Sequence, residues 1–295
     1  MPVLTDNARG ALLMMASMAS FTINDTFVKL VGDDLPLMQI LFLRGLATTT
    51  LIGLLAWRLR AIELRLSGRD AALVALRTAC EVGAAYFFLT ALINMPLANV
   101  TAILQVLPLT VALGGALVFG ESLGWRRLTA ILVGFAGMLL IVRPGPEGFN
   151  LYAGYALVAV GMVTVRDLAT RRMSSAVPSL TVTLAAASGV TLFAALAGLG
   201  QDWAPLTTRH ATLVGASAVF IMGGYLFSVL VMRVGEVAVV APFRYTGLLW
   251  ALVLGWAVFG DWPAPLTLLG AAIIAATGIY TMLREARLAR RARAA

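Results

Sequence analysis

The stretch ANVTAILQVLPLTVALGGALVFGESLGWRRLTAILVGFAGMLLIVR, residues 98–143, returns in altered form as AVVAPFRYTGLLWALVLGWAVFGDWPAPLTLLGAAIIAATGIYTMLR, residues 238–284. Each copy begins with a long apolar run that ends in Phe-Gly-acid, at Phe119-Gly120-Glu121 and at Phe259-Gly260-Asp261. A short polar turn follows, and then a second apolar run that carries Gly137 or Gly278. Two such copies indicate duplication of a membrane-embedded unit, an architecture typical of secondary transporters.

The composition of the whole chain supports a membrane protein. Apolar residues make up 60% and charged residues 12% of the 295 residues, whereas soluble domains hold about 45–50% and roughly 25%. A helix needs roughly 20 apolar residues to cross a bilayer. The sequence predicts ten such spans, at residues 9–31, 36–57, 70–93, 96–118, 126–143, 150–172, 178–200, 210–232, 236–259 and 264–283.

Signals for other classes of protein are missing from the sequence. The first apolar stretch contains Asp25 and Lys29 and is too long for a signal peptide, so it is interpreted as a retained span. A single cysteine, Cys80, and a single histidine, His210, provide neither a disulfide framework nor metal-ligand spacing. We therefore expect no metal and no cofactor.

The residues that give the chain its net charge of +8 are distributed unevenly among the loops. Arginines gather in alternate loops, and acidic residues gather in the others, which is the positive-inside pattern. It predicts an even number of spans with both termini cytoplasmic, and it explains the basic charge without a nucleic-acid partner. The arginine-rich side holds Arg9, Arg58, Arg60, Arg65, Arg69, Arg126, Arg127, Arg171, Arg172, Arg233 and the basic tail from Arg284 to Arg293; the other side holds Asp33, Asp34, Glu147, Asp202 and Asp261, with Arg143 and Arg209.

Ten spans in two copies leave five spans in each half. Because five is odd, the second half enters the membrane from the opposite side, and the halves are inverted. The segment Arg143-Pro144-Gly145-Pro146-Glu147-Gly148 cannot continue a helix and marks the join. The sequence thus predicts an all-α integral membrane protein of ten transmembrane helices in two inverted five-helix repeats, residues 1–145 and 146–295.

Motif residues recur at matching places in the halves: Pro108-Leu109, Gly115, Phe119-Gly120-Glu121 and Gly137 in the first, and Phe259-Gly260-Asp261 and Gly278 in the second. This pattern resembles the drug/metabolite transporter superfamily with two EamA-type repeats, and the chain as a whole resembles its bacterial amino-acid and metabolite exporters, in particular the aromatic amino-acid type. The second repeat departs from the pattern with Leu248 in place of proline and Asp261 in place of glutamate. The resemblance implies fold and transport rather than a particular substrate.

Charged side chains inside spans cost about 2.5–3.5 kcal/mol each on insertion scales and therefore mark a pathway or a pair. Asp25 and Lys29, and likewise Arg77 and Glu81, have the i,i+4 spacing of helix ion pairs, so each set is either a structural pair or, through its acid, a proton site. Adjacent residues point about 100° apart on a helix. Arg166 and Asp167 are therefore not expected to face one site together, and we assign them to a gate.

Arg244 has no acidic residue at i±3 or i±4 on its own span, where it lies beside Tyr245 and just after Pro242. A guanidinium next to a helix break suits a carboxylate, which it binds with two parallel hydrogen bonds. The alternative is an ion pair with Glu81 or Asp167 across the bundle. The sequence leaves both readings of Arg244 open.

The fourth span is the counterpart of the ninth, and Thr101, Gln105 and Pro108 share one of its faces. This face either binds substrate or makes hydrogen bonds between helices, and the same choice applies to Asn24 and Tyr86. The candidate substrate-binding residues are thus Asn24, Glu81, Tyr86, Thr101, Gln105, Arg244 and Tyr245; candidate proton or gate residues are Asp25, Arg77, Arg166 and Asp167.

The function that follows is a secondary transporter, not an enzyme, that exports amino acids or related small metabolites across the bacterial inner membrane by alternating access. No nucleotide-binding motif is present to supply energy. The partners expected are a small-molecule substrate and the lipid bilayer, with the chain as a monomer. Alternatives are a carrier for a sugar, nucleoside or drug, a channel, or a lipid-modifying membrane enzyme.

Overall fold

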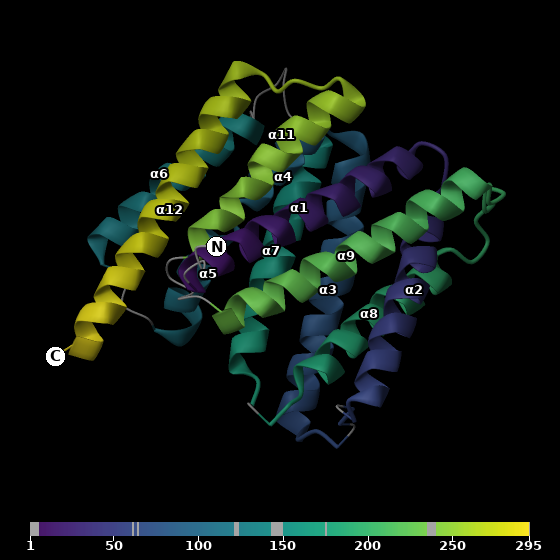
Figure 1. Ribbon diagram of the computed structural model, residues 1–295, viewed down its shortest axis with the longest axis horizontal. Helices are drawn as coiled ribbons and strands as arrows, with labels where there is room; N and C mark the ends of the chain where they lie inside the picture. Colours follow the sequence, from purple (N-terminus) through teal and green to yellow (C-terminus); the bar gives the residue numbers. More distant parts are fainter. Residues whose placement is uncertain are drawn as a thin grey trace, which may run out of the picture.

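The computed structural model describes residues 6–60, 62–63, 65–120, 124–142, 150–174, 176–234 and 240–294, and within these ranges it is helical without strands (Figure 1). The helices of the first half are α1 (Asp6–Gly32), α2 (Leu37–Arg58), α3 (Gly68–Asn94), α4 (Leu97–Leu104), α5 (Leu107–Phe119) and α6 (Trp125–Val142). Those of the second half are α7 (Leu151–Arg172), α8 (Ser179–Ala197), α9 (Thr208–Val234), η1 (Ala241–Tyr245), α11 (Thr246–Phe259) and α12 (Pro265–Ala294).

The predicted spans are confirmed as helices, with one difference in length and one in continuity. Nine described segments are long and apolar enough to cross a membrane, and the tenth, Leu128–Val142 in α6, is shorter. The fourth span was expected as a continuous helix and the ninth as a helix with a break near Pro242, and both are interrupted: α4 gives way to α5 at Gln105–Val106, and the 3-10 turn η1 precedes α11. Pro108 in the first turn of α5 and Pro242 in η1 fit these interruptions, because proline removes a backbone donor.

Each span has a counterpart five spans away in the other half of the chain. When every span is replaced by its counterpart, the set of packed helix pairs stays the same. The most extensive packing joins four pairs of helices. Under this replacement the pair α1–α9 becomes the pair α7–α3. The pairs α2–α8 and α6–α12 each keep the same two helices. In Figure 1, α6 and α12 lie along one edge of the bundle and α2 and α8 along the other. This is the pairing that a twofold axis between two inverted halves requires.

Individual hydrogen bonds follow the same symmetry. Thr49 of α2 and Thr191 of α8 share a hydrogen bond of 3.1 Å, so two equivalent residues meet each other as they must on a twofold axis. At one end of the bundle Gln39 of α2 exchanges two hydrogen bonds with the backbone of Ala204, at 2.8 and 2.9 Å. At the other end the equivalent Thr181 of α8 accepts a 3.0 Å hydrogen bond from the backbone of Glu63.

The repeated Phe-Gly motif ends a helix in each half. Gly120 and Gly260 adopt φ values of +67° and +70°, a left-handed conformation that glycine takes without a Cβ penalty. After Gly260 the chain folds back, and the backbone N–H of Asp261 donates to the carbonyl of Gly255 at 3.0 Å. The motif is thus a C-terminal helix cap.

Two locations at the ends of the bundle matter below. The Lys29 end holds the last turns of α1, α3 and α11, and the Arg171 end holds the last turns of α5, α7 and α9, because neighbouring spans run in opposite directions. The predicted join of the repeats, with Glu147, lies outside the described residues, so the division at residues 145 and 146 stays a prediction.

Candidate functional site

The interruptions of the fourth and ninth spans meet at the middle of the bundle. Gln105 and Tyr245 stand at equivalent positions, the same distance before Phe119 and Phe259. The amide Nε2 of Gln105 donates to the backbone carbonyl of Arg244 at 3.4 Å, which links the two breaks directly. Discontinuous helices that meet in this way form the substrate sites of many secondary transporters, because they place free backbone groups at mid-membrane.

Of the predicted residues at these breaks, Gln105 is buried and its side chain contacts the opposite repeat, as the polar face predicted. Thr101 supplies the carbonyl that accepts from the backbone N–H of Gln105 at 3.2 Å. Tyr245 is 6% exposed, and its hydroxyl lies against the backbone of Gly278 on α12 without a hydrogen-bond partner. The side chain of Tyr245, which belongs to the ninth span, therefore packs against α12, the tenth span.

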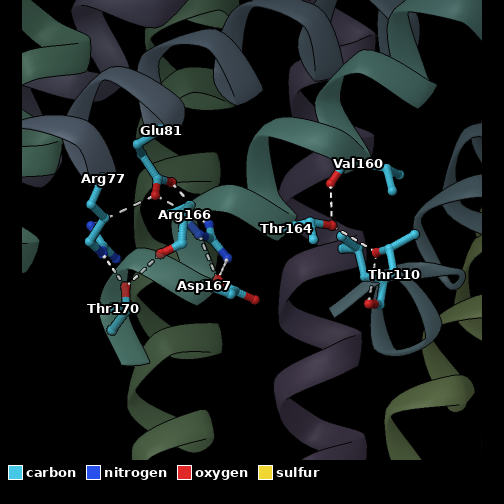
Figure 2. A network of polar contacts seen from close by, with 9 residues as sticks. Arg77, Glu81, Thr110, Val160, Thr164, Arg166, Asp167 and Thr170 are labelled. Atoms are coloured by element: carbon cyan, nitrogen blue, oxygen red, sulfur yellow. Dashed lines mark hydrogen bonds and ion pairs between the residues drawn. The ribbon is translucent and has the colours of Figure 1, made fainter. Parts of the chain in front are cut away.

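A network of charges connects α3 and α7 (Figure 2). Arg166 Nη1 lies 3.2 Å from Glu81 Oε2, and Arg166 Nη2 lies 2.8 Å from Asp167 Oδ1. Arg77 is a more distant partner, with Nη1 at 3.9 Å from Glu81 Oε2 and Nε donating to Thr170 Oγ1 at 3.1 Å. The predicted i,i+4 pair is present but weak, and the principal partner of Glu81 is on another helix.

This network corrects the expectation that Arg166 and Asp167 cannot serve one site. Their Cα–Cβ directions do diverge, but the long arginine side chain bends back so that its Nε donates to Asp167 Oδ1 at 2.9 Å while Nη1 reaches Glu81. Beside the network, Thr110 of α5 and Thr164 of α7 share a hydrogen bond of 2.7 Å (Figure 2). Three helices from both halves are thus joined by polar contacts in the membrane region.

The predicted pairing of Asp25 with Lys29 is wrong. Lys29 Nζ instead donates to the carbonyls of Leu92, Ile93 and Met95, at 3.1, 3.1 and 2.8 Å. Those carbonyls end α3 and have no partner within the helix, so a nearby ammonium group is their natural donor. Asp25 is left to accept a 2.9 Å hydrogen bond from Asn24 Nδ2.

Asn24 is 2% exposed, and its Oδ1 has no hydrogen-bond partner in the described structure. Tyr86, another predicted residue, makes edge-on ring contacts with Phe87 at 5.2 Å and with Phe193 of α8 at 6.2 Å. The structure therefore places Asn24 beside Asp25 and places Tyr86 in an aromatic cluster one and a half turns from Glu81.

Two residues of the site were not among the predicted ones. Arg44 of α2 interacts electrostatically with Asp25, Tyr225 and Glu81. Tyr225 of α9 in turn interacts with Glu81, Arg166 and Arg44. The signal for Arg44 was available, since it is a charge inside a span with no acid at i±4; Tyr225 gave none, because tyrosines within spans usually pack.

Arg44 and Arg244 share a further property. Neither guanidinium has a hydrogen bond or an ion pair within the part of the chain that the structure describes, although Asp25 acts on Arg44 and Asp167 on Arg244 through space. Asp25 likewise lacks an ion pair there. Among the described residues, the central layer therefore combines one ion pair, Glu81 with Arg166, and three charged groups without an ion pair, Asp25, Arg44 and Arg244. No cluster of His, Cys, Asp and Glu suited to a metal is found in the described ranges.

Comparisons with known proteins agree with this architecture. The EamA-like transporter family matches residues 8–143. The chain is similar to the pseudopaline exporter CntI of Pseudomonas aeruginosa, with 26% identity over 268 residues that cover 90% of this chain and 93% of the relative. It is also similar to a riboflavin transporter of Rhizobium johnstonii, with 28% identity over 67% of this chain and 65% of the relative.

A further relative is the S-adenosylmethionine uptake transporter of Rickettsia prowazekii, with 22% identity over 64% of each chain. A solved crystal structure superposes on 95% of this chain and 98% of its own with a TM-score of 0.64 and 18% sequence identity, which supports the fold. The named relatives move chemically different solutes in different directions.

Proposed function

We propose that this chain, whose relatives are drug/metabolite transporters, is a secondary transporter that exports amino acids or related small metabolites across the bacterial inner membrane. Transport proceeds by alternating access around the layer where α4 and α5 meet η1 and α11. Both termini are cytoplasmic, the Lys29 end faces outward and the Arg171 end faces the cytoplasm. The transporter works as a monomer, and it is not an enzyme.

The observation that carries the proposal is the set of charged groups that have no ion pair among the described residues of the central layer. An amino acid at neutral pH bears a carboxylate and an ammonium group. Arg44 and Arg244 offer guanidinium groups that bind a carboxylate through two hydrogen bonds, and Asp25 offers an acceptor for the ammonium. Charges without partners in a membrane are costly, so a substrate of complementary charge stabilises the loaded site.

Glu81 has a different role from Asp25 in this proposal. It is already bonded to Arg166 and so holds α3 against α7, whereas Asp25 remains available for substrate or for a proton. Tyr86, Thr101, Gln105 and Asn24 line or support the same layer, and Tyr245 supports Arg244 through its packing against α12. Arg77 and Asp167 extend the layer toward the Arg171 end.

The test is counterflow with purified protein in liposomes. Vesicles loaded with an unlabelled amino acid should accumulate the same labelled amino acid, and the matched amine without a carboxylate and the matched acid without an amino group should compete poorly. Accumulation of a sugar or nucleoside but of no amino acid would favour the alternative carriers of the same superfamily. Ion conductance without saturable counterflow would favour a channel.

The similarity to a pseudopaline exporter along nearly the whole chain is in keeping with the proposed export direction. The similarity to riboflavin and S-adenosylmethionine transporters supports a wider range of solutes. Riboflavin carries no carboxylate, so its failure to compete in the same vesicles distinguishes the two possibilities.

A further inference from the structure

A hollow lies at the end of α2, where the second span leaves the bundle. It has a volume of about 660 Å³ and is lined by Trp57, Arg58, Arg60 and Ile62. Sites for small molecules have volumes of about 300–1,000 Å³, so the hollow has room for more than a single phosphate ion. Because α2 begins at the Lys29 end of the bundle, the hollow lies at the opposite, Arg171 end.

The lining combines cationic and apolar side chains, and all four are accessible. Trp57 is 72% and Ile62 40% exposed, and Arg58 and Arg60 are exposed as well. A tryptophan at the end of a transmembrane span lies at the level of the lipid headgroups. A molecule bound in the hollow would therefore contact guanidinium groups and apolar surface together, which suits an amphiphilic anion.

Within the part of the chain that the structure describes, the two guanidinium groups of the hollow have no hydrogen bond and no ion pair. The acidic residues that follow them along the chain are bonded elsewhere. Glu63 Oε1 accepts from the backbone N–H of Arg65 at 2.8 Å. Asp70 accepts from Ser67 Oγ and from the backbone N–H of Ser174, both at 3.0 Å. The two positive charges are thus available to an anion from outside the chain.

The backbone of Arg60 is unusual for an arginine. Its φ is +50°, and no other described residue except glycine has a positive φ. A residue with a Cβ is strained in this conformation, and such positions gather at ligand-binding sites. At the end of α8, the counterpart of α2, Gly200 takes a similar conformation with φ +79°. The turn itself needs only glycine, so the fold does not explain the arginine.

The positive-inside pattern accounts for the charge of this connection but not for its arrangement. Arg65 and Arg69 carry the same charge in the same connection and lie outside the lining of the hollow. The orientation of a membrane protein depends on how many basic residues a loop holds, whereas a binding site depends on where they lie. The two explanations therefore predict different effects for different arginines.

We propose that this hollow binds the headgroup of an anionic phospholipid from the surrounding bilayer. Arg58 and Arg60 donate to the phosphate oxygens, which guanidinium groups bind through two parallel hydrogen bonds. Trp57 and Ile62 contact the glycerol and the first methylene groups of the acyl chains. In the proposed orientation the hollow faces the cytoplasmic leaflet, whose anionic lipids attract basic segments. The inference does not depend on which solute the protein carries.

The test measures lipid binding by native mass spectrometry of delipidated protein in detergent micelles. Dioleoylphosphatidylglycerol, which is anionic, is compared with dioleoylphosphatidylcholine, which has the same acyl chains and no net charge. Each arginine near an anionic lipid contributes a preference of about fivefold. The parent protein should therefore bind its first phosphatidylglycerol about 25-fold more tightly than its first phosphatidylcholine.

Arg58→Gln and Arg60→Gln should each reduce this preference about fivefold, and the double variant should remove it. The matched control is Arg65→Gln with Arg69→Gln, which removes the same charge from the same connection and should retain the full preference. Glycine adopts the left-handed conformation without strain. Arg60→Gly should therefore be at least as stable as the parent, yet lose as much preference as Arg60→Gln.

An unchanged preference in the double variant of Arg58 and Arg60 overturns the proposal. So does an equal loss in the control pair, because it would show a diffuse basic surface in place of a site. Inorganic phosphate at the same concentration should not displace the lipid from the parent protein, since it gains nothing from Trp57 and Ile62. Displacement by inorganic phosphate would assign the hollow to soluble phosphate compounds and refute the lipid headgroup.

Discussion

Glu81 has two arginine partners, and double-mutant cycles can establish which of them matters. The structure gives the strong contact to Arg166 on α7, where Nη1 lies 3.2 Å from Oε2 and 3.4 Å from Oε1. The contact with Arg77, one turn away on α3, is 3.9 Å long. We consider Glu81→Ala, Arg77→Ala, Arg166→Ala and the two double variants that combine Glu81 with each arginine.

The magnitudes follow from geometry and exposure. Hydrogen bonds to charged groups contribute about 1.5–3 kcal/mol when well shielded. The side chains of Arg166 and Glu81 are 24% and 21% exposed, so partial screening brings the expected coupling to about 1.5 kcal/mol. The Arg77–Glu81 pair resembles an i,i+4 helix pair and should couple by only about 0.3–0.5 kcal/mol.

The single variants should also differ. In Glu81→Ala the guanidinium of Arg166 keeps its bonds to Asp167, and Arg77 loses only a long contact and keeps its hydrogen bond to Thr170. In Arg166→Ala the carboxylate of Glu81 keeps only the long contact to Arg77, and an unpaired charge is costly inside a bundle. Arg166→Ala should therefore destabilise the protein more than Glu81→Ala.

The assay is reversible unfolding in mixed detergent micelles, followed by the fluorescence of the six tryptophans, with each coupling free energy taken from the cycle. Thr183→Ala, an exposed hydroxyl that bonds only to its own helix, is the matched control. An Arg77–Glu81 coupling equal to or larger than the Arg166–Glu81 coupling would refute the reasoning. Full counterflow in a stable Glu81–Arg166 double variant would remove Glu81 from the transport pathway.

Three further predictions concern other parts of the molecule. Arg244→Ala should abolish most amino-acid counterflow while unfolding at nearly the parent concentration of denaturing detergent, and Arg244→Lys should restore only part of it because lysine lacks the planar fork; normal transport by folded Arg244→Ala excludes a carboxylate site there. Gly278→Ala should destabilise by about 1–3 kcal/mol, since its Cβ overlaps the Tyr245 hydroxyl, whereas Gly215→Ala on α9, where a Cβ meets nothing within 4 Å, should be neutral or stabilising; equal effects would contradict this packing. A reporter fused after Ala295 should be active only in the cytoplasm, and activity on the other side would overturn the proposed orientation.

The spans and their caps were predictable because both depend on local sequence. A run of apolar residues long enough to cross the bilayer forms a helix wherever it is inserted, and the Phe-Gly turn needs only glycine's left-handed conformation, seen at Gly120 and Gly260. The interruption at Gln105 was less visible. Pro108 was interpreted only as part of a polar face, and the structure places the break three residues earlier, where Gln105 finds a partner in the other half.

Side-chain partners were harder to predict, because spacing along one helix does not reveal what the next helix offers. Asp25 and Lys29 have ideal ion-pair spacing, yet the free carbonyls at the end of α3 attract Lys29 more strongly than one carboxylate does. Adjacent residues on a helix point about 100° apart, but this did not separate Arg166 from Asp167. The arginine side chain is long enough to bend toward Asp167 and Glu81 together. Arg44 is a charge inside a span, but its proximity to Asp25 depends on how α1 and α2 pack, which the sequence does not reveal.

The two halves carry similar residue types at some equivalent positions and different residue types at others. At the ends of the bundle the pairs match in kind, Lys29 with Arg171 and Phe259 with Phe119, and one central pair, Asp25 with Asp167, also matches. The other central pairs differ: Asn24 corresponds to Arg166, Gln105 to Tyr245, and Leu104 to Arg244.

The proposed alternating-access function offers a reason for this division. In alternating access the two ends of the bundle open in turn, so inverted copies of one structure can serve both sides. A substrate such as an amino acid has two different ends, and identical central residues would present the same group to both. In the proposed site, Asp25 would accept the ammonium group and Arg244 would bind the carboxylate, and Leu104, the counterpart of Arg244, offers no such charge, which is the asymmetry that a zwitterion needs.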